Sequence, residues 1–429
     1  MSASSTRKRS TVSIVSETVE HVDDEAWAAV DYLARLGAAM LAADYSVDYV
    51  RKVLAGASDR YHLEPRLLIL PNYIQVGESC NSRIEHVGTA LRYDQAFQLG
   101  GLVRRTYRNT ISPADGTAEL TRILALPRPL PWWVNMIGYA VQSAAYGLIL
   151  QPTPAGLVAA TGFGLLVGAL DIVARFNAAF LRLLPFFCAF IVTFAAFTIG
   201  RWLHMGQDSL RVLIPPLTLF LPGVGITLAI LEASTGEVVS AAARLTQGFT
   251  RLAQLALGIV LAIQALGITQ WELTDVPRNT FGAWAPWVGV AVYGVGIMLY
   301  HGPPRRFLPW LLLILYVSYA AQFGTAQLFG AYTSGFGGGL ALMLCTLALG
   351  ELRMTPSSRV LLAPGFWLMV PSSIGLVGIT EIVGGDGDST NAIILMLVSM
   401  LSISLGFQAG RAVWALLPAR IRLRDNGAY

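Results

Sequence analysis

Charged residues are scarce in this sequence and unevenly distributed. Only 13% of the 429 residues are Asp, Glu, Lys or Arg, whereas a soluble globular protein carries about 25%. The charged residues gather in residues 1–132, and from Trp133 onward long apolar runs alternate with short polar joints. This shift marks the main domain boundary. The net charge of +4 gives no reason to expect nucleic acid as a partner.

Cysteine and lysine are also rare. Cys80, Cys188 and Cys345 are far apart, so the sequence predicts neither a disulfide framework nor a Cys-x-x-Cys metal site. Lys8 and Lys52 are the two lysines, a bias typical of GC-rich bacterial genomes. Residues 1–24 lack the apolar stretch of a signal peptide, so we expect a disordered tail there and a cytoplasmic N-terminal domain.

Motifs that carry catalysis are missing as well. The chain has no Gly-x-x-x-x-Gly-Lys-Ser/Thr phosphate loop, so we do not expect ATP to be its direct energy source. It has no metalloprotease, lipase or Ser/His/Asp pattern. We therefore expect no enzyme activity, no cofactor and no metal.

Ten stretches from residue 133 onward are candidate membrane-spanning helices, which need about 20 mostly apolar residues. They lie near 133–150, 154–173, 184–203, 211–231, 248–269, 283–300, 308–322, 333–350, 360–382 and 391–417. Arginines concentrate in the joints that face the cytoplasm if the N-terminus is inside, and few occupy the other joints. Because cytoplasmic loops are enriched in Lys and Arg, the sequence predicts ten spans with both termini in the cytoplasm.

An internal similarity relates the first five spans to the last five. Pro222 and Pro371 are 149 positions apart, and so are Glu232 and Glu381; chance similarity between apolar runs is the alternative. Because each unit has an odd number of spans, the second enters the membrane from the opposite side, as in many transporters. The predicted fold is a membrane all-α protein with ten transmembrane helices as two inverted five-helix repeats, preceded by a small α+β cytoplasmic domain.

The fourth and ninth spans contain prolines and glycines that break a helix. Proline lacks an N–H and crowds the preceding turn, so backbone groups near Pro222 and Pro371 are left for protein, water or ligand to satisfy. Half-helix ends present N–H groups to a carboxylate and carbonyls to an ammonium group; the alternative is that the prolines only kink packed helices. The expected substrate-binding residues are Thr218, Pro222, Gly223, Gly225, Thr227, Pro371, Ser372, Ser373 and Gly375.

The ionisable residues inside spans or at their ends include the acidic residues Asp171, Glu232 and Glu381. Charge within a membrane is costly, so we regard these residues as candidates for proton coupling or gating. For Asp171 the simpler interpretation is an ion pair with Arg175, one helical turn away. For Glu232 and Glu381 it is a side chain that reaches from a span end to water.

The N-terminal region has the pattern of a small α+β domain. Helical spacing of apolar residues predicts a helix over Glu25–Ala43, and Ser46 is placed to cap a second helix reaching about Tyr61. Strands are expected over 66–77 and 83–93, followed by a helix over 94–108, and Ser112-Pro113 predicts the start of a helix ending near Leu126. The expected parts of the chain are thus the tail 1–24, the cytoplasmic domain 25–132, the membrane repeats 133–270 and 283–418, and a cytoplasmic tail 419–429.

Three segments resemble a known family. Tyr93–Leu126 is similar to the helical pair that precedes the first span in that family. Pro216–Leu245, with Leu-Pro-Gly and a later Gly-Glu, resembles the family's first membrane unit. Leu362–Glu381, with Ala-Pro-Gly and a second proline, resembles its second membrane unit. The family is the bacterial threonine/serine exporters, and the resemblance covers about residues 26–415. The second helix departs from the family, since Ala43-Asp-Tyr-Ser46 stands where members usually have Gly-Ala-Ser.

The resemblance implies a secondary transporter that exports threonine and serine from the cytoplasm, driven by the proton-motive force, in the bacterial inner membrane. The expected partners are a small amino-acid substrate, protons and the lipid bilayer, and association into a homo-oligomer stays open. Two alternatives also stay open. An exporter of small dicarboxylates such as succinate would need a basic residue near the midplane, and a membrane-anchored sensor or scaffold would need only anchoring helices.

Overall fold

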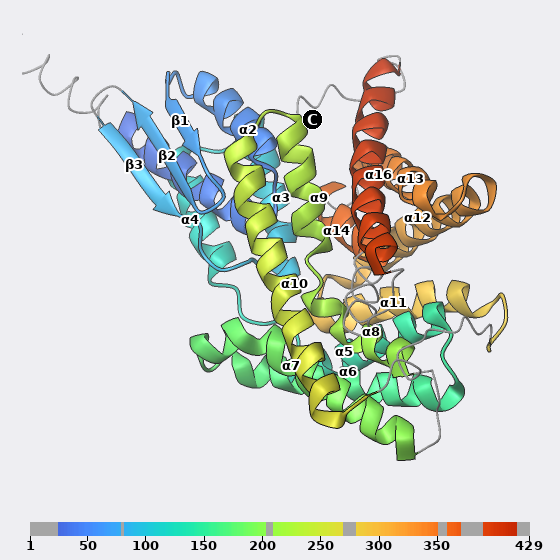
Figure 1. Ribbon diagram of the computed structural model, residues 1–429. Coiled ribbons are helices and arrows are strands. Elements are labelled where there is room, and N and C mark those ends of the chain that lie inside the picture. Colours follow the sequence, from blue (N-terminus) through green and yellow to red (C-terminus); the bar gives the residue numbers. More distant parts are fainter. Residues whose placement is uncertain are drawn as a thin grey trace, which may run out of the picture. The chain divides into compact units, whose positions relative to one another are not determined.

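The computed structural model describes residues 25–78, 81–202, 209–268, 280–350, 358–369 and 389–417. Within these residues the protein is mostly helical and carries one small sheet, as predicted (Figure 1). The chain divides into two compact units, and the boundary falls between Pro127 and Arg128. Each unit is described by itself below.

The N-terminal unit combines helices with a three-stranded antiparallel sheet of order β1-β2-β3. Its elements are α1 (25–42), α2 (Val47–Arg60), β1 (Arg66–Ile69), β2 (Tyr73–Glu78), β3 (Asn81–His86), α3 (Tyr93–Tyr107) and α4 (Pro113–Leu124). The Ser112 hydroxyl accepts a hydrogen bond from the Asp115 N–H at 3.1 Å, so the predicted cap of α4 is confirmed. Ser46 stands at the N-cap position of α2, but its side chain makes no capping bond.

The sheet differs from the prediction in both of its segments. The single strand predicted over 66–77 is wrong, because the chain turns between Ile69 and Tyr73 to form β1 and β2. Pro71 has no N–H to donate to a ladder, and proline and asparagine favour turns. The second predicted strand ends at His86, well before Tyr93, where α3 begins.

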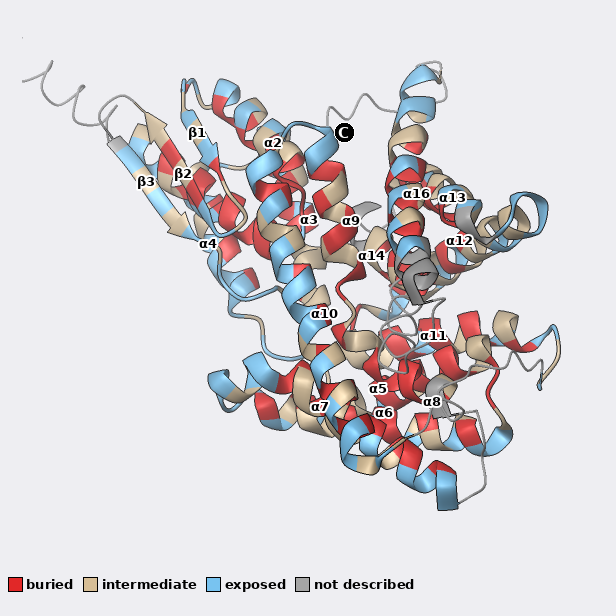
Figure 2. Ribbon diagram, in the orientation of Figure 1, coloured by how far each residue is buried: buried red, intermediate tan, exposed pale blue. Residues whose placement is uncertain are grey.

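The core of this unit lies between the helices and one face of the sheet (Figure 2). Ile74 is fully buried, and a Cβ built on Gly37 of α1 would lie 2.3 Å from the Ile74 Cδ1 atom. Glycine at position 37 therefore allows the close approach of α1 to the sheet. Leu68 and Ile84 flank Gln75 on the opposite face and are exposed.

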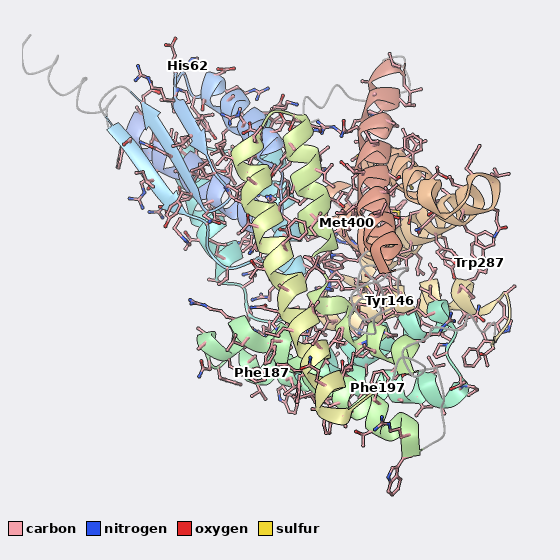
Figure 3. The ribbon with its side chains drawn as sticks, viewed as in Figure 1. His62, Tyr146, Phe187, Phe197, Trp287 and Met400 are labelled. Atoms are coloured by element: carbon pink, nitrogen blue, oxygen red, sulfur yellow. The ribbon has the colours of Figure 1, made fainter. Side chains whose placement is uncertain are left out.

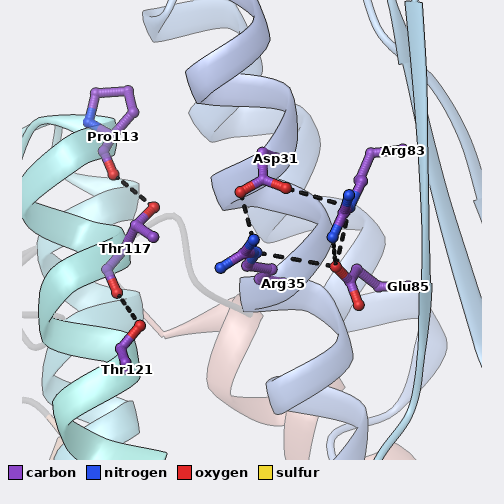
Figure 4. A network of polar contacts seen from close by, with 7 residues as sticks. All are labelled: Asp31, Arg35, Arg83, Glu85, Pro113, Thr117 and Thr121. Atoms are coloured by element: carbon purple, nitrogen blue, oxygen red, sulfur yellow. Dashed lines mark hydrogen bonds and ion pairs between the residues drawn. The ribbon is translucent and has the colours of Figure 1, made fainter.

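A network of ion pairs joins α1 to β3 (Figure 4). The Asp31 carboxylate contacts Arg35 at 3.0 Å and Arg83 at 3.2 Å, and Glu85 contacts Arg83 at 2.6 Å. The two arginines are about two-fifths exposed, and exposed ion pairs contribute about 0–1 kcal/mol each. The network therefore contributes more to the alignment of α1 on β3 than to stability.

A buried hydroxyl pair joins α1 to α3. The Tyr32 hydroxyl lies 2.5 Å from the Thr106 hydroxyl. Burial raises the pKa of Tyr32 to about 12, because the phenolate would lose its hydration. Tyr32 is thus a neutral core residue rather than an acid–base group.

The second unit is entirely helical where it is described. Its helices are α5 (Trp132–Leu150), α6 (Pro154–Ala174), α7 (Ala178–Trp202), α8 (Ser209–Leu217), η2 (Thr218–Phe220), α9 (Gly223–Ser234), α10 (Val238–Leu266), α11 (Ala285–His301), η4 (Arg305–Phe307), α12 (Leu308–Phe329), α13 (Ala331–Gly350), α14 (Ser358–Leu368) and α16 (Ser389–Leu416). A helix occupies at least part of every predicted span, although α7 and α10 begin earlier and α12 ends later than expected.

These helices have the character of a multi-pass membrane protein. Five of the described helices are long and apolar enough to cross a membrane, or six if the bent pair α8–α9 counts as one span. Large apolar side chains on the helices of this unit are exposed, including Val158 at 73%, Leu257 at 54% and Leu405 at 55%, as contact with lipid requires. The full count of ten spans stays a prediction.

Helices α5 and α11 pack antiparallel and very closely. A Cβ on Gly138 would lie 2.4 Å from the Tyr300 nitrogen, and one on Gly289 would lie 2.9 Å from the Ala145 oxygen. The Asn135 amide donates a hydrogen bond to the Tyr300 carbonyl. Two helical turns further along α5, the Gln142 amide donates a hydrogen bond to the Gly296 carbonyl of α11. Small residues and polar amides are the usual means of joining helices in a membrane.

Two further pairs, α7 with α10 and α13 with α16, contact each other with both helices running in the same direction. A Cβ on Gly258 of α10 would lie 2.5 Å from the Phe186 oxygen, and one on Gly406 of α16 would lie 2.4 Å from the Phe336 oxygen. Gly339 of α13 faces the α16 backbone at a similar distance. The glycines of 335–339 therefore form a close-packing seam within a regular helix.

The seam predicts a position-specific effect of alanine. We expect Gly406→Ala to lower the free energy of unfolding by about 1–3 kcal/mol, because the new methyl group would overlap the Phe336 carbonyl. The control is Gly324→Ala in α12, where a Cβ meets no atom within 4 Å. Thermal unfolding of the purified full chain in detergent measures both, and equal stabilities would contradict the seam.

Candidate functional site

The predicted break in the fourth span is present between α8 and α9. Helix α8 ends just after Pro215 and Pro216, the chain passes through the 3-10 turn η2 and Leu221, and α9 starts at Gly223. The two helices are bent by 57°. The bend coincides with Pro222, the N-cap residue of α9, which has no N–H with which to continue the preceding helix.

The tyrosine hydroxyl of α5 satisfies two backbone groups that the break releases. The Tyr139 hydroxyl donates to the Pro216 carbonyl at 2.7 Å and accepts from the Leu219 N–H at 3.1 Å. Tyr139 is 1% exposed, so water does not compete for these bonds. The sequence analysis expected the carbonyl end of this half-helix to be open to a ligand. In the structure the Tyr139 hydroxyl is hydrogen-bonded to it.

The N-terminal end of α9 has a different environment. Pro222 is its N-cap residue and supplies no side-chain hydrogen bond. Gly223 is buried, whereas Gly225 is half-buried and has no neighbouring atom within 4 Å of a Cβ position. The first-turn N–H groups of a helix carry partial positive charge and bind anions. This end of the break therefore suits a carboxylate.

Two predicted threonines flank the break and differ in their bonding. The Thr218 hydroxyl donates to the Pro215 carbonyl at 2.8 Å and so satisfies its own turn. Thr227 is 1% exposed, and its hydroxyl has no hydrogen-bond partner among the described residues. An unsatisfied buried hydroxyl costs about 1–3 kcal/mol, and of these two threonines Thr227 is the one whose hydroxyl is left unsatisfied among the described residues.

Asp171 takes part in a polar cluster that links α6 to α11. Its carboxylate contacts Arg175 at 2.5 Å, so the predicted ion pair within the helix is present. The same oxygen accepts a hydrogen bond from the Tyr300 hydroxyl at 3.2 Å. The Tyr300 ring lies 5.4 Å from the ring of Tyr139. The cluster thus extends from Asp171 to the residue that holds the helix break.

Glu232 is not a side chain that reaches to water. Its side chain is fully buried, and its carboxylate pairs with Arg244 of α10 at 3.0 Å, where the arginine side chain is 11% exposed. The interpretation of Glu232 as a group extended into solvent is wrong, because α9 and α10 form a tight helical hairpin around it. A gate needs a contact that holds two helices together, and a buried ion pair at the end of a span is such a contact.

The remaining predicted site residues are Pro371, Ser372, Ser373, Gly375 and Glu381, and they lie outside the described residues. Among the described residues, no group of three His, Cys, Asp or Glu side chains is arranged to hold a metal ion. His62 and His86, the two histidines of the N-terminal unit that lie within the described residues, are exposed.

Sequence reasoning missed Tyr139, Tyr300 and Arg244. Each is an ordinary residue within an apolar helix or near its start, and its role depends on partners on other helices. The one available signal was the presence of hydroxyl groups in spans of otherwise apolar character.

Comparison with known proteins gives one match. Residues 31–266 match the family model ThrE, described as "Putative threonine/serine exporter". The matched region contains the N-terminal unit, α5 to α10 and the helix break. No curated protein and no solved structure matches the chain.

Proposed function

Because the chain belongs to the threonine/serine exporter family, we propose that it carries threonine and serine out of the cytoplasm across the bacterial inner membrane, driven by the proton-motive force. The observation that carries this proposal is the helix break at α8–α9, whose carbonyl end is occupied by Tyr139 and whose N–H end has no side-chain cap. A family of transporters is not a class of enzymes.

The substrate binds, in this proposal, at the N-terminal end of α9. Its carboxylate accepts from the N–H groups of Gly223 and Gly225, where the helix dipole favours negative charge. The open space beside Gly225 admits it. The Thr227 hydroxyl, buried and without a partner among the described residues, supplies a further polar contact. In this proposal Ser372, Ser373 and Gly375, which follow Pro371 and lie outside the described residues, complete the site from the second repeat.

We propose further that the membrane unit consists of ten spans in two inverted five-helix repeats. The packing supports this. Gly258 on the parallel pair α7–α10 and Gly406 on the parallel pair α13–α16 are 148 positions apart, and their contacts Phe186 and Phe336 are 150 apart. These intervals are close to the 149 that separates Pro222 from Pro371 in sequence.

The ionisable residues have two roles in this proposal. Asp171 carries the coupling proton, since it is the carboxylate that contacts both Arg175 and the cluster at the break. The Glu232–Arg244 pair forms a gate at the cytoplasmic end of the first repeat. Glu381, in the second repeat, acts at the opposite face of the membrane. Both assignments rest on the predicted orientation with the termini, and the domain 25–132, in the cytoplasm.

Efflux from preloaded cells tests the proposed function. Cells that contain the protein should lose labelled threonine and serine faster than cells without it, and an uncoupler should abolish the difference. Labelled succinate should leave at the same rate in both. Selective efflux of succinate would replace the proposal by dicarboxylate export, and unchanged efflux of all three would support a sensor or scaffold.

A threonine variant connects this assay to the site. We expect Thr227→Val to raise the KM for threonine efflux about tenfold, the effect of one lost hydrogen bond of about 1.4 kcal/mol. Its stability should not fall, because the hydroxyl has no protein partner among the described residues to lose. Thr246→Val is the control, since the Thr246 hydroxyl donates to its own helix at an exposed position. Identical efflux by both variants would place the substrate elsewhere.

A further inference from the structure

One helix, α5, contacts the C-terminal ends of two other helices, α8 and α14. The Tyr139 hydroxyl donates to the Pro216 carbonyl at 2.7 Å, and the Tyr146 hydroxyl donates to the Trp367 carbonyl at 2.6 Å. Pro216 is the penultimate residue of α8, and Trp367 is the penultimate residue of α14. The carbonyls at a helix C-terminus have no partner within the helix, and each tyrosine hydroxyl donates a hydrogen bond to one of them.

The spacing of the two tyrosines places them on one face of α5. They are seven positions apart, which is two helical turns, and both are buried at 1% and 7% exposure. Figure 3 shows Tyr146 within the group of membrane helices. Each ring packs on a tyrosine of α11, Tyr139 on Tyr300 at 5.4 Å and Tyr146 on Tyr293 at 5.2 Å. The α11 tyrosines are also seven positions apart.

We infer that α5 couples helices α8 and α14, with Tyr139 and Tyr146 as the positioning residues through which the two helices move together. This inference rests on the proposed transport function. Helix α5 is a continuous helix and moves as one body. If α8 shifted alone, the Pro216 carbonyl would lose its donor in a region without water, which is costly. A shift of α5 displaces both hydroxyls, so the C-terminal ends of α8 and α14 rearrange together rather than independently.

Hydrogen exchange of the full chain in detergent tests the coupling without any transport assay. Tyr139→Phe removes one hydroxyl and keeps the ring, and should raise amide exchange about tenfold in residues 217–223 and also in residues 362–369. Tyr146→Phe should have the reciprocal effect. Tyr316→Phe is the control, because the Tyr316 hydroxyl also donates to a backbone carbonyl, that of Trp287 in α11, at 2.9 Å. Faster exchange confined to each variant's own segment, or a control that behaves like them, would overturn the inference.

Efflux kinetics provide the second readout. Each Tyr→Phe variant should lower the maximal rate of threonine efflux about tenfold with KM within about twofold, as expected for a slowed conformational step. The double variant should be no slower than the slower single variant, because coupled residues are not additive. If the fold-decrease in the maximal efflux rate of the double variant equals the product of the two single decreases, the two hydrogen bonds act independently, and the inference is overturned. If the wild-type protein moves neither threonine nor serine, the proposed function fails, while hydrogen exchange still decides on the coupling.

Discussion

Replacing Glu232 by glutamine should lower the free energy of unfolding by about 3–5 kcal/mol. The Glu232 side chain is fully buried and the Arg244 side chain is 11% exposed, so the variant leaves a cation inside the protein without its carboxylate. Breaking a buried ion pair from one side typically has an effect of this size. Chemical unfolding of the purified full chain in mixed micelles, followed by tryptophan fluorescence, measures it.

Two controls separate charge from general disruption at this position. Glu119→Gln removes a carboxylate that pairs with Arg105 and Arg122 on the surface of the N-terminal unit, and it should change stability by about 0–1 kcal/mol. The double variant Glu232→Leu with Arg244→Leu should recover most of the loss, because a well-packed apolar pair replaces two buried charges at little cost. A Glu232→Gln protein as stable as the wild type would mean that the pair does not hold α9 against α10.

Replacing Asp171 by asparagine should lower net threonine efflux by about a hundredfold or more, the usual effect of removing a positioned proton-transfer group. Asparagine keeps the size of the side chain but cannot take up a proton, and it loses the charge that faces Arg175 and the Tyr300 hydroxyl. Exchange of internal for external threonine should persist, because exchange requires no net release of a proton. Paired efflux and exchange assays in the same vesicles measure the difference.

The control for Asp171→Asn is Asp31→Asn. Asp31 also forms an ion pair with an arginine four residues later, Arg35 at 3.0 Å, but on the partly exposed surface of α1. This variant should export threonine at the wild-type rate. If Asp171→Asn exports as fast as Asp31→Asn, Asp171 has only the structural role of pairing with Arg175.

The sequence was most informative where structure depends on neighbouring residues. Pro222 has no N–H with which to continue a helix wherever that helix packs, so the break before Gly223 was predictable. Ser112 caps α4 through an atom three residues away. The same local chemistry explains the error in the sheet, since the turn signal at Pro71 was present and the long apolar run concealed it.

The partners of polar groups were not predictable from the sequence. Tyr139 bonds a carbonyl 77 positions away, and Tyr300 bonds a carboxylate 129 positions away. No local pattern determines which helices meet, and burial depends on that meeting. Glu232 illustrates the difference, because the sequence suggested a side chain that reaches water from a span end, whereas the packing of α10 buries it in an ion pair with Arg244.

The sequence by itself thus determined that the chain is a helical membrane protein with a small α+β domain and a broken helix near Pro222, because hydrophobicity and proline chemistry act locally. The tertiary structure alone decided which end of that break is free. Tyr139, brought to the break by the packing of α5, occupies the carbonyl of Pro216, and no side chain among the described residues caps the N–H groups at Gly223.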